Sequence, residues 1–252
     1  DTAALKKRVA QIKEIVGETV SLCYSMKANP FFVPAMITCV DKLEVCSPGE
    51  LTICKKLGVD ASRIIYSGVN KEIPDIKEAY EYGVGTFTAE SVRQADLIQQ
   101  VVETAAAGEK AEVILRLNSG SQFGMSKEDL LTILQCRESK YTSLNFTGIH
   151  YFVGTQRKRA KRKIKELQML LELFEEIQNK YGLKLKKLEY GPGFAVPYFE
   201  DDDFEDTLYP VKELKDTLKQ VAQQVDLTIE MGRFFTAECG TYYTNVADLK
   251  TV

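Results

Sequence analysis

Short apolar runs alternate with amphipathic stretches along almost the whole chain, and this alternation limits the possible folds most. The apolar runs have the length of buried strands and lie at residues 20–26, 43–46, 64–67, 85–88, 113–117, 146–153, 185–190 and 227–231. Between them, helical patterns lie near residues 2–16, 32–40, 48–57, 72–82, 90–105, 126–137, 160–181 and 209–224. Eight strands separated by helices predict an α/β fold, a TIM-type (β/α)8 barrel. A doubly wound open sheet is the alternative.

Composition sets the broad class of the protein. The chain has 252 residues, 44% of them hydrophobic, and can bury the core of one large domain. The net charge of −3 gives no indication of nucleic acid as a partner, and no run of eighteen apolar residues indicates a membrane. The six cysteines form no C-x-x-C pair, and with a single histidine, His150, we expect no metal site. We expect reduced thiols, no signal peptide and a cytoplasmic protein.

One lysine stands at the end of the first apolar run. The run over residues 20–26 is followed by Lys27, and Pro30 comes three residues later, so a buried strand ends here and a helix begins. Burial lowers the pKa of an ammonium group and makes the neutral amine nucleophilic, as covalent catalysis on a carbonyl requires. The alternative is a lysine whose charged end reaches the rim.

Polar residues at the ends of the last two runs add to this site. In such a barrel the active site forms at the carboxyl ends of the strands. The turns at Gly191 and Gly193 and the guanidinium of Arg233 suit a phosphate, although such glycines often only make a turn. Glu230 lies in an apolar run and needs a cationic partner; a salt bridge to a neighbouring strand is its alternative role. Together with Lys27 these groups predict pyridoxal 5′-phosphate (PLP), with its aldehyde at Lys27 and its ring nitrogen at Glu230.

Five motifs in this order resemble those of a known family. They are YSMKANP, EVCSPGEL, GIHYFVGTQ, EYGPGF and EMGR, and the match extends over essentially the whole chain. The family is that of the alanine-racemase-type barrel PLP decarboxylases, which act on ornithine, diaminopimelate or arginine. The resemblance implies decarboxylation of an amino acid through a Schiff base on Lys27 and a quinonoid intermediate, with Glu230 keeping the ring nitrogen protonated. The catalytic residues would be Lys27 and Glu230, and the cofactor would contact Lys27, Glu44, Arg116, His150, Phe152, Thr155, Gly191, Gly193, Glu230, Gly232 and Arg233.

Two positions depart from the family pattern. Phe152 stands where the family usually has a second histidine that stacks on the cofactor ring, and Gln122 stands where a lysine is usual. A phenyl ring can still stack, but it cannot donate a hydrogen bond. A family member that decarboxylates a glutamyl group attached to a carrier protein also has a non-histidine aromatic residue there. An amino-acid substrate linked to a carrier protein is therefore one expectation, and the substrate itself stays open.

The last residues have a different composition. Residues 234–252 are β-branched and aromatic, so we expect a PLP-binding barrel at residues 1–233 and then the first strand of a C-terminal β domain that is otherwise absent from this chain. By resemblance, that domain supplies residues that read the substrate and return its proton, and much of a homodimer contact. We therefore expect this chain alone to be incomplete as an enzyme. The alternatives are a barrel-only PLP-binding or homeostasis protein, an amino-acid racemase of the same fold, and a non-catalytic regulator.

Overall fold

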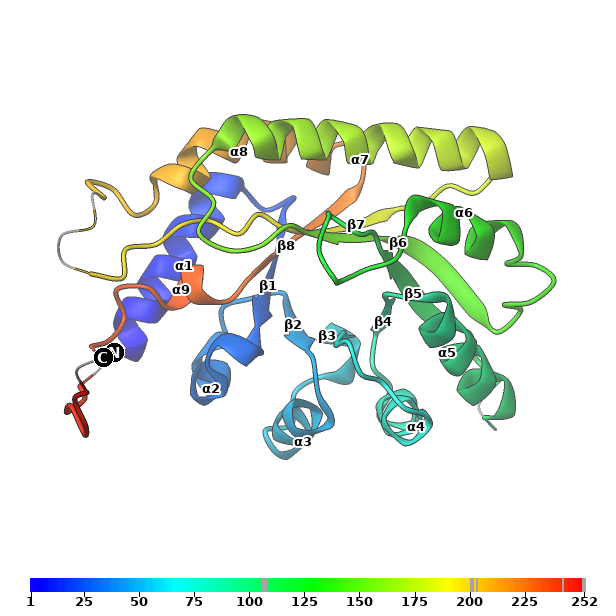
Figure 1. Ribbon diagram of the computed structural model, residues 1–252, viewed down its shortest axis with the longest axis horizontal. Helices are drawn as coiled ribbons and strands as arrows, with labels where there is room; N and C mark the ends of the chain where they lie inside the picture. Colours follow the sequence, from blue (N-terminus) through cyan, green and yellow to red (C-terminus); the bar gives the residue numbers. More distant parts are fainter. Residues whose placement is uncertain (106–107, 200–201, 203, 242, 251–252) are drawn as a thin grey trace.

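Eight parallel strands close into a barrel in the computed structural model, which describes residues 1–105, 108–199, 202, 204–241 and 243–250 (Figure 1). Each strand pairs with the next one along the chain, and the last pairs with the first. The strands are β1 (Ser21–Ser25), β2 (Lys42–Val45), β3 (Ile64–Tyr66), β4 (Thr86–Ala89), β5 (Ala111–Arg116), β6 (Leu144–Phe152), β7 (Lys187–Gly191) and β8 (Asp226–Met231). The predicted TIM-type barrel is confirmed, and the doubly wound sheet is wrong.

Helices connect the strands and surround the barrel (Figure 1). They are α1 (Thr2–Val16), α2 (Val33–Met36), α3 (Pro48–Lys56), α4 (Ile73–Tyr82), α5 (Val92–Thr104), α6 (Lys127–Gln135), α7 (Ala160–Tyr181), α8 (Tyr209–Ala222) and α9 (Arg233–Thr236), with 3-10 helices η1 (Met26–Ala28), η2 (Pro30–Phe32) and η3 (Ala61–Arg63). The predicted helix near residues 32–40 is shorter than expected, because α2 ends at Met36 and residues 37–39 form turns. No helix in the described part of the chain is long and apolar enough to cross a membrane.

Serine side chains cap the N-termini of three of these helices. Ser47, Ser91 and Ser126 each accept a hydrogen bond from the backbone N–H three residues later, at the beginnings of α3, α5 and α6. Such caps satisfy amides that have no partner within the helix, and each contributes about 1 kcal/mol. They fix the point at which the chain turns from a strand end into the next helix, and so they shape the mouth of the barrel.

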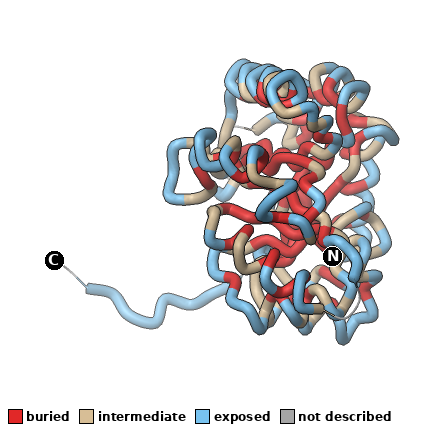
Figure 2. The backbone as a smooth tube through the Cα atoms, turned by 90° about the vertical axis from the view of Figure 1, so that its right-hand side faces the viewer, coloured by how far each residue is buried: buried red, intermediate tan, exposed pale blue. Residues whose placement is uncertain are grey.

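The strands separate an outer apolar core from a polar interior. Leu22 and Tyr24 of β1 belong to the large apolar cluster between strands and helices. Cys23 instead forms a small separate cluster with Ile65 and Ile114, because successive side chains of a strand point to opposite faces. Buried residues lie mainly in the interior of the molecule, and exposed ones on its outside, in Figure 2. Charged and polar side chains fill much of the remaining interior, so the barrel can hold a polar site.

The segment after β8 differs from the prediction. Residues 233–236 form helix α9 instead of the start of a strand, with Phe234 and Phe235 buried. The ring of Phe234 lies 5.0 Å from that of Phe194, and its carbonyl accepts a hydrogen bond from Arg8 of α1. These contacts attach α9 to the barrel. The described residues 237–241 and 243–250 contain no strand, and the end of the chain extends away from the body in Figure 2. The second domain stays a prediction.

Candidate functional site

A cavity of about 220 Å³ opens at the carboxyl ends of β1, β6, β7 and β8. The catalytic end of the barrel was predicted from the order of the strands, and several expected residues meet there. Those that line the cavity are Lys27, Phe152, Thr155, Gly193, Glu230, Gly232 and Arg233. Residues more than 200 positions apart in the sequence thus share one pocket, since β8 closes the barrel against β1.

Lys27 lies in the short helix η1, two residues beyond the end of β1. Its Nζ donates a hydrogen bond to Glu44 Oε2 at 2.9 Å and lies 3.8 Å from Glu230 Oε1. The side chain is 51% exposed. The prediction that a buried strand ends in this lysine is therefore wrong in detail: the turn of η1 carries the amine to the rim of the cavity, above two buried carboxylates.

The charge on Lys27 also differs from the prediction. Burial acts to lower the pKa of Lys27, but the carboxylates of Glu44 and then Glu230 raise it, and the net pKa lies well above the usual value. The expected fall in the pKa of this amine is wrong, because the sequence alone does not show two carboxylates at contact distance. The structure holds the group as an ammonium, and a proton must leave it before it can act as a nucleophile.

Glu230 and His150 form a buried pair beside this lysine. Glu230 Oε2 lies 3.4 Å from Nε2 of His150, and both side chains are almost fully buried. Burial acts to raise the pKa of Glu230, but the positive charge of Lys27 and the contact with His150 lower it well below the usual value. The expected cationic partner of Glu230 is therefore Lys27, the ion pair proposed above as its alternative role. The ion pair with Lys27 keeps Glu230 ionised on the wall of the cavity.

The turns after β7 and β8 approach the cavity with little bulk. A Cβ atom on Gly193 would overlap the carbonyl oxygen of Gly154, and its φ of +58° favours glycine. A Cβ atom on Gly232 would lie 2.8 Å from that of Ala28. Arg233 is exposed, makes no ion pair with any described residue, and has its guanidinium 5.2 Å from the ring centre of Tyr198. Thr155, also exposed, completes a rim that offers a cation and a hydroxyl.

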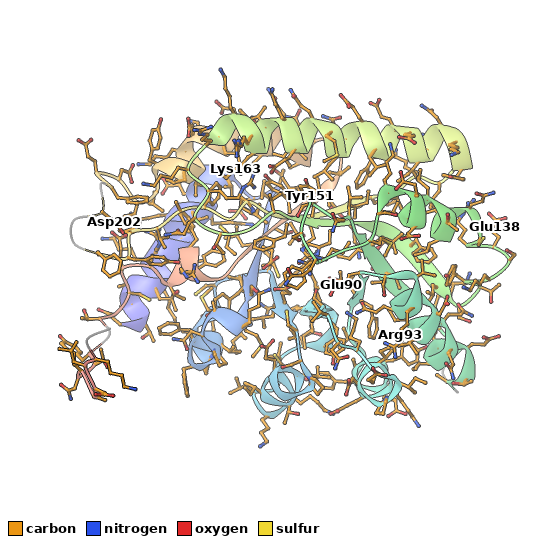
Figure 3. The ribbon with its side chains drawn as sticks, viewed as in Figure 1. Glu90, Arg93, Glu138, Tyr151, Lys163 and Asp202 are labelled. Atoms are coloured by element: carbon orange, nitrogen blue, oxygen red, sulfur yellow. The ribbon has the colours of Figure 1, made fainter. Side chains whose placement is uncertain are left out.

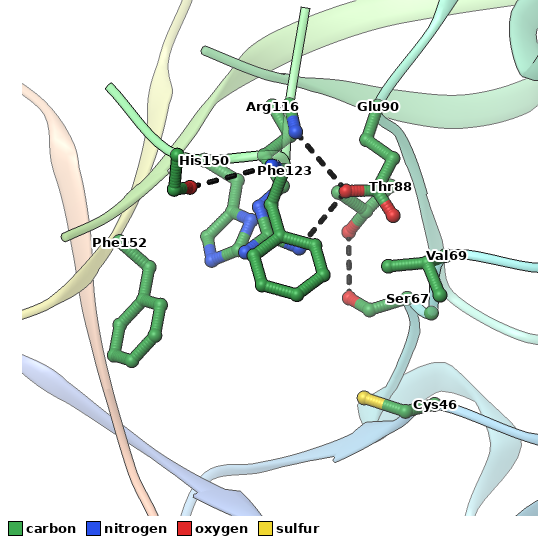
Figure 4. Close-up of polar contacts among 12 residues, drawn as sticks. Cys46, Ser67, Val69, Thr88, Glu90, Arg116, Phe123, His150 and Phe152 are labelled. Atoms are coloured by element: carbon green, nitrogen blue, oxygen red, sulfur yellow. Dashed lines mark hydrogen bonds and ion pairs between the residues drawn. The ribbon is translucent and has the colours of Figure 1, made fainter. Parts of the chain in front are cut away.

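Phe152 is the last residue of β6, and its ring forms part of the cavity wall. The ring occupies the space that a side chain on Gly191 would need. Gly191 itself is the last residue of β7 and does not line the cavity. The role of Gly191 is thus to leave room for the phenyl ring of Phe152. In Figure 4 this ring lies apart from the polar cluster around Glu90.

That polar cluster is a neighbour of the cavity. Arg116 Nη1 donates to Glu90 Oε2 at 3.1 Å, and its guanidinium lies 5.1 Å from the ring centre of Phe123 (Figure 4). Glu90 also accepts from the backbone N–H of Gly124 at 3.2 Å. In Figure 3, Glu90 lies near the centre of the barrel, whereas Arg93 lies toward the outer helices. Arg116 was predicted to contact the cofactor, but it does not line the cavity and instead pairs with Glu90.

Three residues of the site were not predicted. The hydroxyl of Ser25 donates to Glu44, and Cys46 Sγ lies 3.7 Å from Nζ of Lys27. Glu189 lies buried inside the barrel, two residues before Gly191. Strand alternation gives a signal for Ser25 and Glu189, because each is separated by an even number of positions from a residue expected to face inward.

The chain is similar to several characterised decarboxylases. It is 29% identical over 223 residues to an L-glutamyl acyl-carrier-protein decarboxylase from Niallia circulans, a match that covers 81% of this chain and 51% of that protein. It is 27% identical to a diaminopimelate decarboxylase from Aquifex aeolicus, covering 91% and 57%. A lysine/ornithine decarboxylase from Selenomonas ruminantium is 31% identical over 183 residues, covering 69% and 45%. The chain thus spans about half the length of these relatives.

Solved structures show the same fold. A lysine/ornithine decarboxylase from Vibrio vulnificus, solved with putrescine, superposes with a TM-score of 0.79 at 21% identity, covering 93% of this chain and 62% of that one. A lysine decarboxylase from Selenomonas ruminantium superposes with a TM-score of 0.79 at 24% identity, covering 93% and 60%.

A family model identifies the domain directly. The model described as the pyridoxal-binding domain of pyridoxal-dependent decarboxylases matches residues 2–237, which include all eight strands and α9. The expected cofactor is confirmed by this match. The chain therefore belongs to the pyridoxal-dependent decarboxylases and carries their pyridoxal-binding domain.

Proposed function

We propose that the protein of which this chain forms the barrel decarboxylates an amino acid with PLP bound in the 220 Å³ cavity. The observation that carries the proposal is the meeting of Lys27, Glu230 and Arg233 at one cavity. An amine, an ionised carboxylate and a guanidinium are the groups that suit an aldehyde, a pyridine nitrogen and a phosphate. The family match supports the same cofactor over residues 2–237.

The residues present fit this cofactor. The close approach of Gly193 to Gly154 and the unpaired guanidinium of Arg233, judged among the described residues, suit the phosphate. Lys27 would hold the cofactor covalently through Nζ, and the face of Phe152 would lie against the ring. Thr155 and the backbone at Gly232 would complete the contacts at the rim.

The remaining contacts are less direct. Glu44 would act through Lys27, because its carboxylate accepts the hydrogen bond from Nζ. His150 would act through Glu230, 3.4 Å away, and Gly191 would act by admitting the ring of Phe152. We propose that Arg116 supports the cavity through the Glu90 cluster.

Each protein group then has a defined task in the reaction. When bound, the cofactor supplies an electron sink for the electron pair left behind as the substrate carboxylate departs as carbon dioxide. The ionised carboxylate of Glu230 would hold a proton on the pyridine nitrogen, which strengthens that sink. Glu44 Oε2 accepts the hydrogen bond from Nζ of Lys27 at 2.9 Å, so it is in position to take the proton that this amine must release.

The substrate is an amino acid, free or linked to a carrier protein. The similarity to the acyl-carrier-protein decarboxylase from Niallia circulans supports a carrier-linked glutamyl group, and so does Phe152, which places a phenyl ring on the cavity wall where the family usually has a histidine. We also propose a cytoplasmic homodimer. All six cysteines are free, as is usual in a reducing compartment. The homodimer rests on the family resemblance, and exposed aromatic rings such as those of Phe31 and Phe199 are available for a subunit contact.

Trapping the cofactor tests the proposal. The chain is loaded with PLP, reduced with borohydride and digested, and we expect the pyridoxyl group on Lys27. Lys71 is the informative competitor, because burial lowers its pKa to about 8 and leaves its amine easier to deprotonate. Lys27→Ala should abolish the label while Lys71→Ala should retain it. A label on Lys71, or on any lysine other than Lys27, contradicts the proposed site.

A further inference from the structure

Glu189 is a buried carboxyl group to which the reaction described above gives no task. It lies in β7, is 2% exposed, and neither of its carboxyl oxygens has a hydrogen-bond partner among the described residues. Its register partner on β8 is Thr228, two residues before Glu230, so Glu189 lies one layer deeper in the barrel than Glu230. A buried carboxylate without partners is costly, and such a group keeps or shares a proton instead.

The neighbouring strand presents a complementary group. His150 of β6 is the register partner of Glu189, and neighbouring strands lie about 4.8 Å apart. Nε2 of His150 contacts Glu230, while Nδ1 is buried and has no partner among the described residues. A carboxyl group and a ring nitrogen that each have no partner among the described residues thus belong to register-paired residues in the interior of the barrel, and they do not hydrogen-bond to each other in the structure.

The charged and titratable groups around Glu189 come from four strands. They are His150 of β6, Glu230 of β8, Cys23 of β1, and Lys42 and Glu44 of β2. Lys42 donates to Thr228 Oγ1 at 3.1 Å, and burial raises the pKa of the Cys23 thiol, which stays neutral. Burial raises the pKa of Glu189 to about 7, against the opposing effect of His150, and Glu44 and Glu230 add to the rise.

We propose that the side chains of Glu189 and His150 turn toward each other and share one proton between the carboxyl group and Nδ1, and that Glu189 thereby keeps Nε2 of the ring protonated and directed at Glu230. With the proton on Glu189, the carboxyl group donates to Nδ1 and the neutral ring carries its own proton on Nε2. With the proton on Nδ1, the ring is an imidazolium that contacts two carboxylates. Both arrangements leave an N–H at Nε2 that stabilises the ionised form of Glu230. Glu189 is therefore a positioning residue that acts through His150.

The consequence for the cofactor rests on the proposed function, since it needs Glu230 at the pyridine nitrogen. The proton sharing itself does not, and it can be measured without cofactor. His150 is the only histidine in the chain, so a protein labelled with ¹⁵N-histidine gives one pair of ring nitrogen signals. These signals report directly which nitrogen carries a proton, which geometry alone does not show.

In the unsubstituted chain we expect a protonated Nε2 at pH 6 and a change in the Nδ1 signal near pH 7. Glu189→Gln should remove that change while Nε2 stays protonated, because the amide can donate to Nδ1 but cannot titrate. Glu189→Met has a similar length but can neither donate nor titrate, so the change near pH 7 should be absent from this variant as well. The control is Glu112→Gln, since Glu112 pairs with Lys187 in the barrel and should leave the His150 signals unchanged.

Three results would overturn the proposal. The first is an unprotonated Nε2 at pH 6 in the unsubstituted chain, a result that needs no variant to fold. The second is a change near pH 7 that survives Glu189→Gln. The third is a change near pH 7 that survives Glu189→Met. Failure of the borohydride test with success here would remove the cofactor role of the site and leave the shared proton in place.

Discussion

Arg233 presents a guanidinium to the cavity without an ionic partner among the described residues. A charge-assisted hydrogen bond to a phosphate contributes about 1.5–3 kcal/mol. Arg233→Ala should therefore weaken PLP binding by about tenfold or more, measured by absorbance titration. The matched control is Arg93→Ala, which removes an exposed arginine that pairs with Glu72 on the outer helices. Equal affinities in the two variants would remove Arg233 from the proposed site.

The site residues show what a sequence can and cannot predict at this scale. Lys27 and Glu230 were expected near each other because each lies at the carboxyl end of a strand of the same barrel. The sign of the pKa change of Lys27 was not predictable, because it depends on which residue of β2 lies opposite Ser25. That register places Glu44 beside the amine of Lys27. The register between two strands cannot be predicted from the sequence of either strand alone.

At the scale of single elements, the turn after β7 carries a sharp expectation. Gly193→Ala adds a Cβ atom that would overlap the carbonyl oxygen of Gly154, so the turns after β6 and β7 must move apart. PLP affinity should fall along with stability. Gly182→Ala is the control, because Gly182 ends α7 with a similar φ of +63° but has no atom near the added Cβ. Both changes cost about 1–2 kcal/mol of backbone strain, and only Gly193→Ala should also disturb the cavity. Comparable PLP affinities would contradict this account of the turn.

The start of α7 carries a second expectation. Arg157 pairs with Glu166, and the buried Nζ of Lys163 donates to the backbone carbonyl of Arg157 at 2.7 Å (Figure 3 labels Lys163), so both have structural partners. Lys161 and Arg162 are exposed at the mouth of the barrel and can attract an acidic carrier protein. Changing both to glutamate should slow turnover of a carrier-linked substrate in a salt-dependent way, with turnover of the free amino acid retained.

The matched control reverses two lysines at the opposite end of the barrel. Lys184 and Lys186 are exposed and precede β7, so they lie on the face away from the mouth. The double change to glutamate there alters the net charge equally and should leave carrier-linked turnover unaffected. An equal loss in both double variants would mean that total charge, and not a docking surface, governs the rate.

At the scale of the whole molecule, Glu189 should give stability a distinct dependence on pH. Its pKa in the folded protein is about 7, above the usual value of 4.5, so folding favours the protonated form. The stabilisation is present below about pH 4.5 and is lost as pH rises through about 7. The shift corresponds to an order of 3 kcal/mol. Denaturant unfolding at pH 5 and pH 8 measures the free energy of unfolding of each variant. Relative to the wild type, Glu189→Gln should be more stable at pH 8 than at pH 5, whereas Glu112→Gln should show no such change. Parallel curves for the wild type and Glu189→Gln would contradict the raised pKa.

The fold itself was largely predictable, and its exceptions have a physical cause. Alternation of short apolar runs with helical patterns located every strand to within a few residues, because the periods of strands and helices differ. Residues 234–236 were expected in a strand, since aromatic and β-branched residues favour strands. They form α9 instead, because Phe234 and Phe235 bury their rings against the barrel. Tertiary packing overrides local preference at such a boundary.

The pairing of β8 with β1 has a consequence for folding during synthesis on the ribosome. About 200 residues separate the two strands, and at about 5–20 residues per second β1 waits on the order of ten seconds or more for its partner. Through that interval the nascent chain presents an uncovered strand edge, a surface on which other chains can pair. The hydrogen bond from Arg8 of α1 to the carbonyl of Phe234 can likewise form only after β8 has been synthesised, because Phe234 follows β8 in the chain. Chaperone demand during synthesis should thus depend on how quickly the final strand arrives, and slow codons placed just before β8 should lower the soluble yield of a protein whose finished form is unchanged.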